Sequence, residues 1–324
     1  MMRTKEGSEA AEVRIGISAC ILGQRVRWDG GHKRDGFIVD TFGRFVKFVP
    51  LCPEVEIGLG IPRETIRLEG KPGALRLVAP KSGRDLTGTM RAYAEGKVVE
   101  LEKLDLSGFI LKKDSPSCGM GRVRVYDKNG VPAKEGRGIF AEVLIARLPH
   151  LPVEEDGRLQ DPRLRENFVE RVFAYRRLRG LFDGAWKLGE LVRFHTAEKL
   201  LLLAHRPEAY TKLGRLVATA KERRRAELAE EYRSTFLDAL AIPATARRHV
   251  NVLQHMAGYF KKILPAEQKA EMAGSIDDFG RGLVPLVVPI TLISHHVKVH
   301  GISYLEGQTY LAPHPKELML RNHV

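Results

Sequence analysis

The segment Asp114-Ser115-Pro116-Ser117-Cys118-Gly119-Met120-Gly121 is the point from which the rest of the chain can be interpreted. It follows an apolar run at residues 107–111, which predicts a short buried strand that ends in a tight polar loop. Glycine lets the backbone approach a ligand closely, and serine supplies a hydroxyl group with little bulk. In open α/β sheets, ligands bind just beyond the carboxyl ends of the strands. The loop around Cys118 is therefore the first candidate for a functional site.

Two earlier strands also lead directly into a cysteine. Residues 13–19 are rich in β-branched side chains and run into Cys20, and residues 45–51 run into Cys52. A helix predicted over residues 87–102 supplies the crossover to the third strand. If the three strands are parallel neighbours, the three cysteines meet at one edge of one sheet. We therefore predict an α/β N-terminal domain with a mainly parallel sheet in a Rossmann-like, three-layer arrangement.

The composition changes near residues 149–160, which read as a linker or an extended segment. Before it, residues 121–138 are rich in glycine and charge and predict a mobile flap. After it, apolar residues recur at three- and four-residue spacing, which is typical of helices. Five helical segments are expected, at residues 163–178, 185–204, 208–236, 245–264 and 265–287. We predict two domains, an α/β domain at residues 1–150 and an all-α domain at residues 151–324.

The overall composition is that of a globular protein with a basic surface. The 324 residues are 44% hydrophobic and 29% charged, with a formal net charge of +13. A basic balance favours anionic partners such as RNA, but the excess is spread along the chain and only residues 221–225 form a basic cluster. No apolar run reaches the roughly 18 residues of a membrane span. Residues 1–13 are polar without the apolar core of a signal peptide, so we expect a cytoplasmic protein with no membrane partner.

The three cysteines leave several interpretations open. Their odd number argues against a disulfide framework, and none forms a Cys-x-x-Cys pair. Each can be a small buried apolar residue, which is the usual role of a free cysteine. Three converging thiolates also make a soft ligand set for zinc, with His32 as a fourth ligand. An iron–sulfur cluster held by three cysteines fits equally well and leaves one iron as an open Lewis acid.

Five polar residues near the predicted sheet edge are candidates for the chemistry. Glu54 lies two residues after Cys52 and is placed to shuttle protons, although a first-turn glutamate also suits a helix dipole. Ser115 and Ser117 can bond a substrate or serve as turn residues. Asp29 lies in a tight turn from which it can contact a substrate, and Arg63 can hold an anionic group.

Five motifs, taken in order, resemble those of the thiouracil desulfidase family, long catalogued as a domain of unknown function. They are ISACILG at residues 17–23, WDGGHK at 28–33, CPEV at 52–55, GLGIPR at 58–63 and KKDSPSCG at 112–119. The resemblance covers about residues 13–148, and Trp28 stands where the family is expected to have tyrosine. The second half resembles the YbgA-type domain, whose function is unsettled. That resemblance rests on FH at residues 194–195, KLLLLAH at 199–205 and PKELMLRNH at 315–323.

The resemblance implies a [4Fe-4S] cluster held by Cys20, Cys52 and Cys118, with an open iron that takes the sulfur of a thiocarbonyl substrate. It implies an enzyme that removes sulfur from a thiolated pyrimidine, free or in RNA, as hydrosulfide and without net electron transfer. Glu54 would be the base or proton shuttle and Ser115 a hydrogen-bond donor. Asp29, Ser117 and Arg63 are the candidate substrate contacts. The alternative is a metal-stabilised protein that binds nucleic acid or docks a partner without catalysis.

Overall fold

The structure is a computed structural model that describes residues 12–71 and 73–323. Residues 1–11 lie outside the described residues. They include most of the polar N-terminal segment from which the absence of a signal peptide was predicted. The chain divides into two compact units, the first ending at Arg158 and the second beginning at Leu159. The first is α/β and the second helical, which confirms the predicted fold class.

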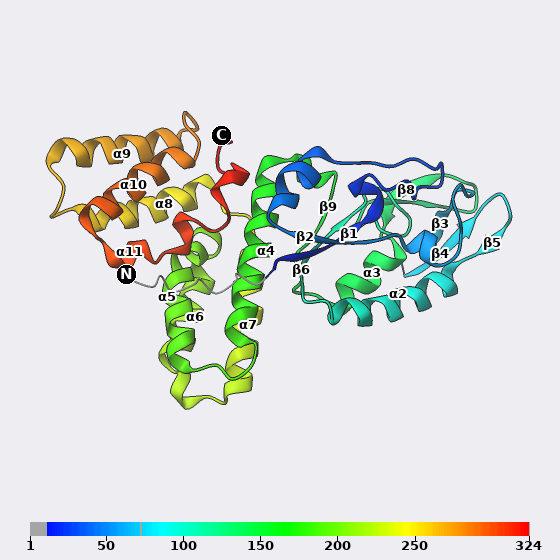
Figure 1. The fold of residues 1–324 in the computed structure, drawn as a ribbon, viewed down its shortest axis with the longest axis horizontal. Coiled ribbons are helices and arrows are strands. Elements are labelled where there is room, and N and C mark those ends of the chain that lie inside the picture. Colours follow the sequence, from blue (N-terminus) through cyan, green and yellow to red (C-terminus); the bar gives the residue numbers. More distant parts are fainter. Residues whose placement is uncertain (1–11, 72, 324) are drawn as a thin grey trace, which may run out of the picture. The chain divides into compact units, whose positions relative to one another are not determined.

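A parallel four-stranded sheet forms the centre of the first unit (Figure 1). The strand order is β2-β1-β6-β9, and all three neighbouring pairs are parallel. The strands are β1 (Arg14–Ser18), β2 (Lys47–Leu51), β6 (Leu106–Leu111) and β9 (Val153–Glu155). Every residue of β6 is buried, as expected for a central strand that is covered on both faces. Strand β9 lies within the segment that the sequence predicts to be a linker or extended segment, and it forms one edge of this sheet.

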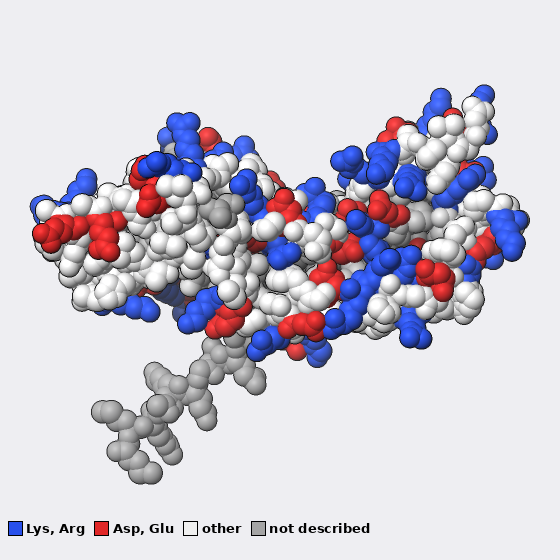
Figure 2. All heavy atoms as spheres, turned by 90° about the horizontal axis from the view of Figure 1, so that it is seen from above, with Lys and Arg blue, Asp and Glu red and all other residues white. Residues whose placement is uncertain are grey.

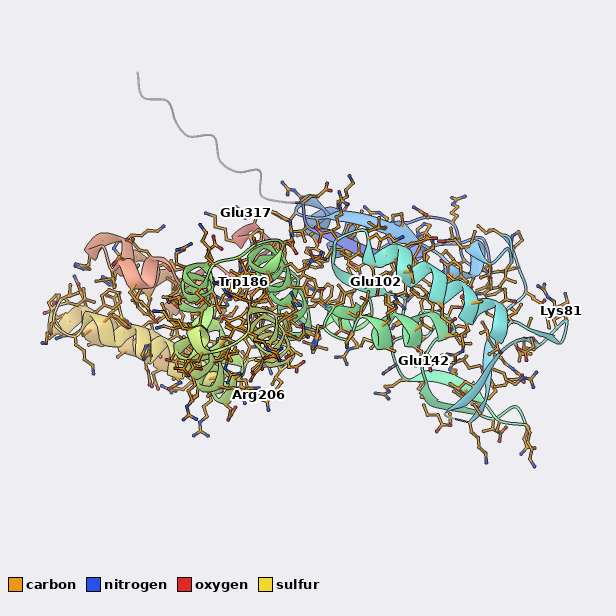
Figure 3. All side chains as sticks on the ribbon, turned by 90° about the horizontal axis from the view of Figure 1, so that it is seen from below. Lys81, Glu102, Glu142, Trp186, Arg206 and Glu317 are labelled. Atoms are coloured by element: carbon orange, nitrogen blue, oxygen red, sulfur yellow. The ribbon has the colours of Figure 1, made fainter. Side chains whose placement is uncertain are left out.

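Two helices pack beside each other in this unit, α2 (Thr87–Glu102) and α3 (Ile139–Arg147) (Figure 1). Their apolar contact with the sheet includes Phe109 of β6 and Phe140 of α3, whose ring centroids are 5.9 Å apart. Two ion pairs link the helices in opposite directions, from Arg147 to Glu102 and from Arg91 to Glu142. Both glutamates are labelled in Figure 3.

A second sheet of five strands was not anticipated from the sequence. Its order is β5-β4-β3-β7-β8, and only β3 and β7 pair in parallel. The strands are β3 (Arg67–Lys71), β4 (Ala74–Ala79), β5 (Arg84–Asp85), β7 (Val123–Tyr126) and β8 (Pro132–Gly136). The segment at residues 121–138, predicted to be a mobile flap, contains the paired strands β7 and β8 of this sheet. Val123 and Val125 alternate with exposed Arg124, and this pattern places one face of β7 in the core.

The second unit is built from eight helices among its described residues. They are α4 (Pro162–Phe182), α5 (Leu188–His205), α6 (Pro207–Ala218), α7 (Arg225–Leu240), α8 (Ala246–Ala257), α9 (Ala266–Gly280), α10 (Val287–His300) and α11 (Ser303–Glu306). The single helix expected at residues 208–236 is two helices, because a turn with buried Ala220 lets α7 pack back on α6. No helix in the described part of the chain is both long and apolar enough to cross a bilayer.

The basic cluster at residues 221–225 has acidic and aromatic partners. Arg223 pairs with Glu231, Arg224 pairs with Glu227, and Arg225 lies over the ring of Trp186. On the face shown in Figure 2, Lys and Arg side chains lie interspersed with Asp and Glu. Because its arginines are already engaged, this cluster gives no support to the idea of an RNA-binding surface.

Candidate functional site

A pocket of about 390 Å³ opens at the carboxyl ends of β1, β2 and β6. Cys20, Cys52 and Cys118 all line it. Cys20 lies in the 3-10 turn Ala19–Leu22 directly after β1, and Cys52 is the N-cap of the short helix α1 (Pro53–Glu56) after β2. Cys118 lies in the loop that follows β6. The parallel order β2-β1-β6 thus brings three residues that are distant in sequence to one edge of the sheet.

The environment of the three thiols is buried but contains positive charge. Burial raises the pKa of all three, to about 11 for Cys20. Lys112 opposes this effect at Cys20, and Arg63 opposes it at Cys52. Cys52 raises the pKa of both other thiols, because neighbouring thiolates repel each other. A positive metal centre that binds the thiolate forms would relieve this repulsion.

The loop that carries Cys118 is held by its own backbone and by α3. The Ser115 hydroxyl accepts hydrogen bonds from the backbone N–H groups of Ser117 and Cys118, at 3.2 and 3.0 Å. The N–H groups of residues 138, 139 and 141 at the start of α3 donate to the carbonyl groups of residues 119, 116 and 117. Gly138 makes this approach possible, because a Cβ atom there would lie 2.4 Å from the Ser117 carbonyl oxygen.

Glu54 projects from α1 into a ring of hydrogen-bond donors. Arg63 donates to its Oε2 atom from both Nε and Nη2, and the Arg63 side chain is only 4% exposed. The hydroxyl of Ser117 donates to Glu54 Oε1 at 3.0 Å, and that of Ser115 does so at 3.4 Å. The carboxylate is thus fixed beside Cys52 with one oxygen on an arginine and the other on two serines.

Comparisons with known proteins match the two halves of the chain to two different families. The profile of a family described as 2-thiouracil desulfurase matches residues 15–156, and that of a protein family of unknown function, DUF1722, matches residues 199–315. The chain is 32% identical to the uncharacterized protein YbgA of Escherichia coli over 161 residues, which are 49% of this chain and 95% of YbgA. It is 31% identical to the uncharacterized protein YbbK of Bacillus subtilis over 110 residues, which are 32% of this chain and 72% of YbbK.

The chain belongs to the 2-thiouracil desulfurase family, fused to a YbgA-type unit. Among solved structures, it is similar to the [4Fe-4S]-dependent thiouracil desulfidase TudS. The identity is 31%, the match covers 46% of this chain and 95% of that one, and the TM-score is 0.39.

The desulfurase unit does not bring every predicted site residue to the pocket. Asp29 is not among the lining residues; its carboxylate accepts the Gly31 N–H at 3.0 Å and pairs with Arg27. Ser117 is fully buried, so its hydroxyl serves Glu54 instead of contacting a substrate. Arg63 lines the pocket, but its guanidinium binds Glu54 and the Gly60 carbonyl group.

His32, the expected fourth ligand of a zinc ion, is also absent from the pocket lining, and its Nδ1 atom accepts the Arg34 N–H. Among the described residues, no group of three or more His, Cys, Asp or Glu side chains is placed to hold a metal ion. Three thiols around a pocket nevertheless suit a cluster, because in a cluster each thiolate binds a different iron atom and the sulfurs need not surround one point.

Sequence reasoning missed Asp156, which fastens the start of the Cys118 loop. Its carboxylate accepts the Lys112 ammonium at 2.7 Å and the Lys113 backbone N–H at 2.8 Å. The Lys112 backbone N–H in turn donates to the hydroxyl of Ser18 at the end of β1. Asp156 comes directly after β9. Its position at the end of a strand, which is also the position of the cysteines, could have identified it as a site residue.

Proposed function

We propose that the first unit hydrolyses the thiocarbonyl group of a thiouracil-like pyrimidine. In this reaction water replaces sulfur on the ring carbon, so that C=S and water give C=O and hydrosulfide, without electron transfer. The observation that carries the proposal is the single pocket shared by three cysteine thiols and the Glu54 carboxylate, in a unit of the desulfurase family.

Cys20, Cys52 and Cys118 are the residues that would hold a [4Fe-4S] cluster. They are the only cysteines of the chain and come from the ends of three adjacent strands, and Lys112 and Arg63 oppose the rise in pKa that burial causes at Cys20 and Cys52. When bound, the cluster would supply an iron without a protein ligand, a Lewis acid for the substrate sulfur.

Glu54 is the group placed to move a proton. Its Oε2 atom is bound by Arg63, whereas the donors to Oε1 among the described residues are serine hydroxyls. In the proposal, Oε1 takes the proton of the attacking water while Arg63 keeps the carboxylate oriented. Ser115 lines the pocket and is the hydroxyl that can turn from Glu54 toward the substrate.

The cluster is tested by metal analysis of protein purified without oxygen. We expect about four irons and four sulfides per chain, with an absorption band typical of iron–sulfur proteins and little zinc. Cys118→Ala should lose the iron. Zinc in place of iron, or wild-type iron in the Cys118→Ala protein, would contradict the assignment.

The role of Glu54 is tested by Glu54→Gln, which keeps the size and hydrogen-bonding capacity of the side chain. We expect iron content to remain at the wild-type level and conversion of 2-thiouracil to uracil to fall by about 10²-fold or more. Glu102→Gln is the matched control, because Glu102 pairs with Arg147 on α3 and does not line the pocket (Figure 3). Equal turnover in the two variants would remove Glu54 from the mechanism.

A further inference from the structure

Trp28 is the only aromatic side chain among the described residues that line the pocket. It is 46% exposed, although tryptophan is usually well covered in folded proteins. Within the described chain its ring has no stacking or cation–π partner, and its indole N–H has no hydrogen-bond acceptor. A large planar surface is therefore left open at the wall of the site.

The backbone of Trp28 is held in place despite this exposure. Its carbonyl group accepts the N–H of Arg63 at 2.9 Å, and Arg63 is the residue that binds Glu54. The flanking turn is closed by hydrogen bonds between Arg27 and Gly30 and between Arg27 and Gly31. The backbone of Trp28 is thus linked through Arg63 to the carboxylate that acts in the proposed reaction.

We propose that Trp28 stacks on the ring of the substrate and selects planar heterocyclic thiocarbonyl compounds over acyclic ones. Aromatic side chains stack on nucleobases with little dependence on the base, because every base presents a π-face. The inference rests on the proposed function, and it adds a residue that determines specificity by orienting the ring so that the thiocarbonyl carbon faces the thiols and Glu54.

Stacking of this kind should act on binding more than on the chemical step. We expect Trp28→Ala to raise the KM for 2-thiouracil by between about 5-fold and about 150-fold, with a smaller change in kcat. Trp28→Phe should remain within a few-fold of wild type, because a planar ring is retained. Val131→Ala is the control, since Val131 is exposed in the same unit but does not line the pocket.

A binding measurement separates this inference from the proposed reaction. The chain has two tryptophans, so in the Trp186→Phe holoprotein Trp28 is the sole indole fluorophore. Uracil, which cannot be desulfurated, should quench its fluorescence saturably, whereas the Trp28→Phe protein, which retains Trp186, should not respond. If wild type converts 2-thiouracil but uracil leaves Trp28 unchanged and Trp28→Ala keeps the wild-type KM, the stacking inference is wrong. If uracil quenches Trp28 but 2-thiouracil is not converted, the proposed reaction is wrong and stacking stands.

Discussion

Glu54 shows how a single side chain in this site combines two demands. The base of the proposed reaction must be open to water, but a carboxylate that is largely buried must also have partners for its charge. The structure separates these tasks between the two oxygens, with Arg63 on one and serine hydroxyls on the other. Sequence proximity to Cys52 was enough to predict the position of Glu54. It could not predict Arg63 as its partner, because an arginine in a loop gives no sign of what it will contact.

His195 provides a prediction for the helical unit. Burial lowers its pKa to about 4, with a smaller contribution from Lys199, and burial also lowers the pKa of His249 to about 4. Because the unfolded chain takes up these protons near pH 6.5, stability should be full above that pH and should fall as the pH drops toward 4. The loss is of order 2 kcal/mol for each histidine at pH 5.

Urea unfolding at pH 7 and pH 5 measures this loss of stability. Hydrogen exchange in α5 and α7 then shows whether the loss affects the helices that carry His195 and Tyr232. His195→Gln removes one titrating group and can still bond the Tyr232 hydroxyl, which lies 3.1 Å from His195 Nδ1. The acid-induced loss should be smaller in this variant by about 2 kcal/mol. An unchanged loss would mean that His195 does not stay neutral in the folded unit.

At the scale of elements, the contact between the Cys118 loop and α3 should control metal binding. Gly138→Ala places a Cβ atom 2.4 Å from a backbone oxygen and 2.8 Å from the Cys118 nitrogen, so the loop must move. We expect iron occupancy to fall and the free energy of unfolding to decrease by about 1–3 kcal/mol.

Gly121→Ala is the control within the same loop, because nothing lies within 4 Å of the added Cβ atom. Iron content and thermal unfolding of both variants test whether the contact with α3 controls metal binding. Wild-type values for Gly138→Ala would show that the loop tolerates displacement from α3.

Elements whose apolar residues form a run or follow helical spacing could be predicted, and elements with few buried residues could not. Strands β1, β2 and β6 and helix α2 were expected near their observed positions, because their apolar residues identify a buried face. The second sheet was missed because β8 is almost wholly exposed and β5 has only two residues. The break between α6 and α7 was missed because the charged residues 221–225, which include no glycine or proline, also suit the solvated face of a single helix.

At the scale of the molecule, the site depends on the last few residues of the first unit. A chain ending at Arg158 keeps β9 and Asp156, whereas one ending at His150 loses both. We expect the longer chain to fold, bind iron and convert 2-thiouracil without the helical unit. The shorter chain should lose soluble yield or iron, because β6 lacks β9, one of its two neighbours, and Lys112 lacks its carboxylate.

Circular dichroism, iron content and turnover of the two truncated chains test this expectation. Equal behaviour of the two chains would show that β9 is dispensable. Failure of both would show that the desulfurase unit depends on the helical unit. The boundary near residue 150 was predicted from composition alone, and composition does not reveal that three residues of an apparent linker pair with a central strand.

The position of β9 also fixes an order of events during synthesis. All three cysteines leave the ribosome before residues 153–156, yet the strand and the carboxylate that fasten the Cys118 loop are the last parts of the unit to emerge. The loop that carries Cys118 thus gains its contacts with β9 and Asp156 only when the first unit is nearly complete. The cluster of the proposed function would therefore find its complete site only after residues 153–156 have been synthesised.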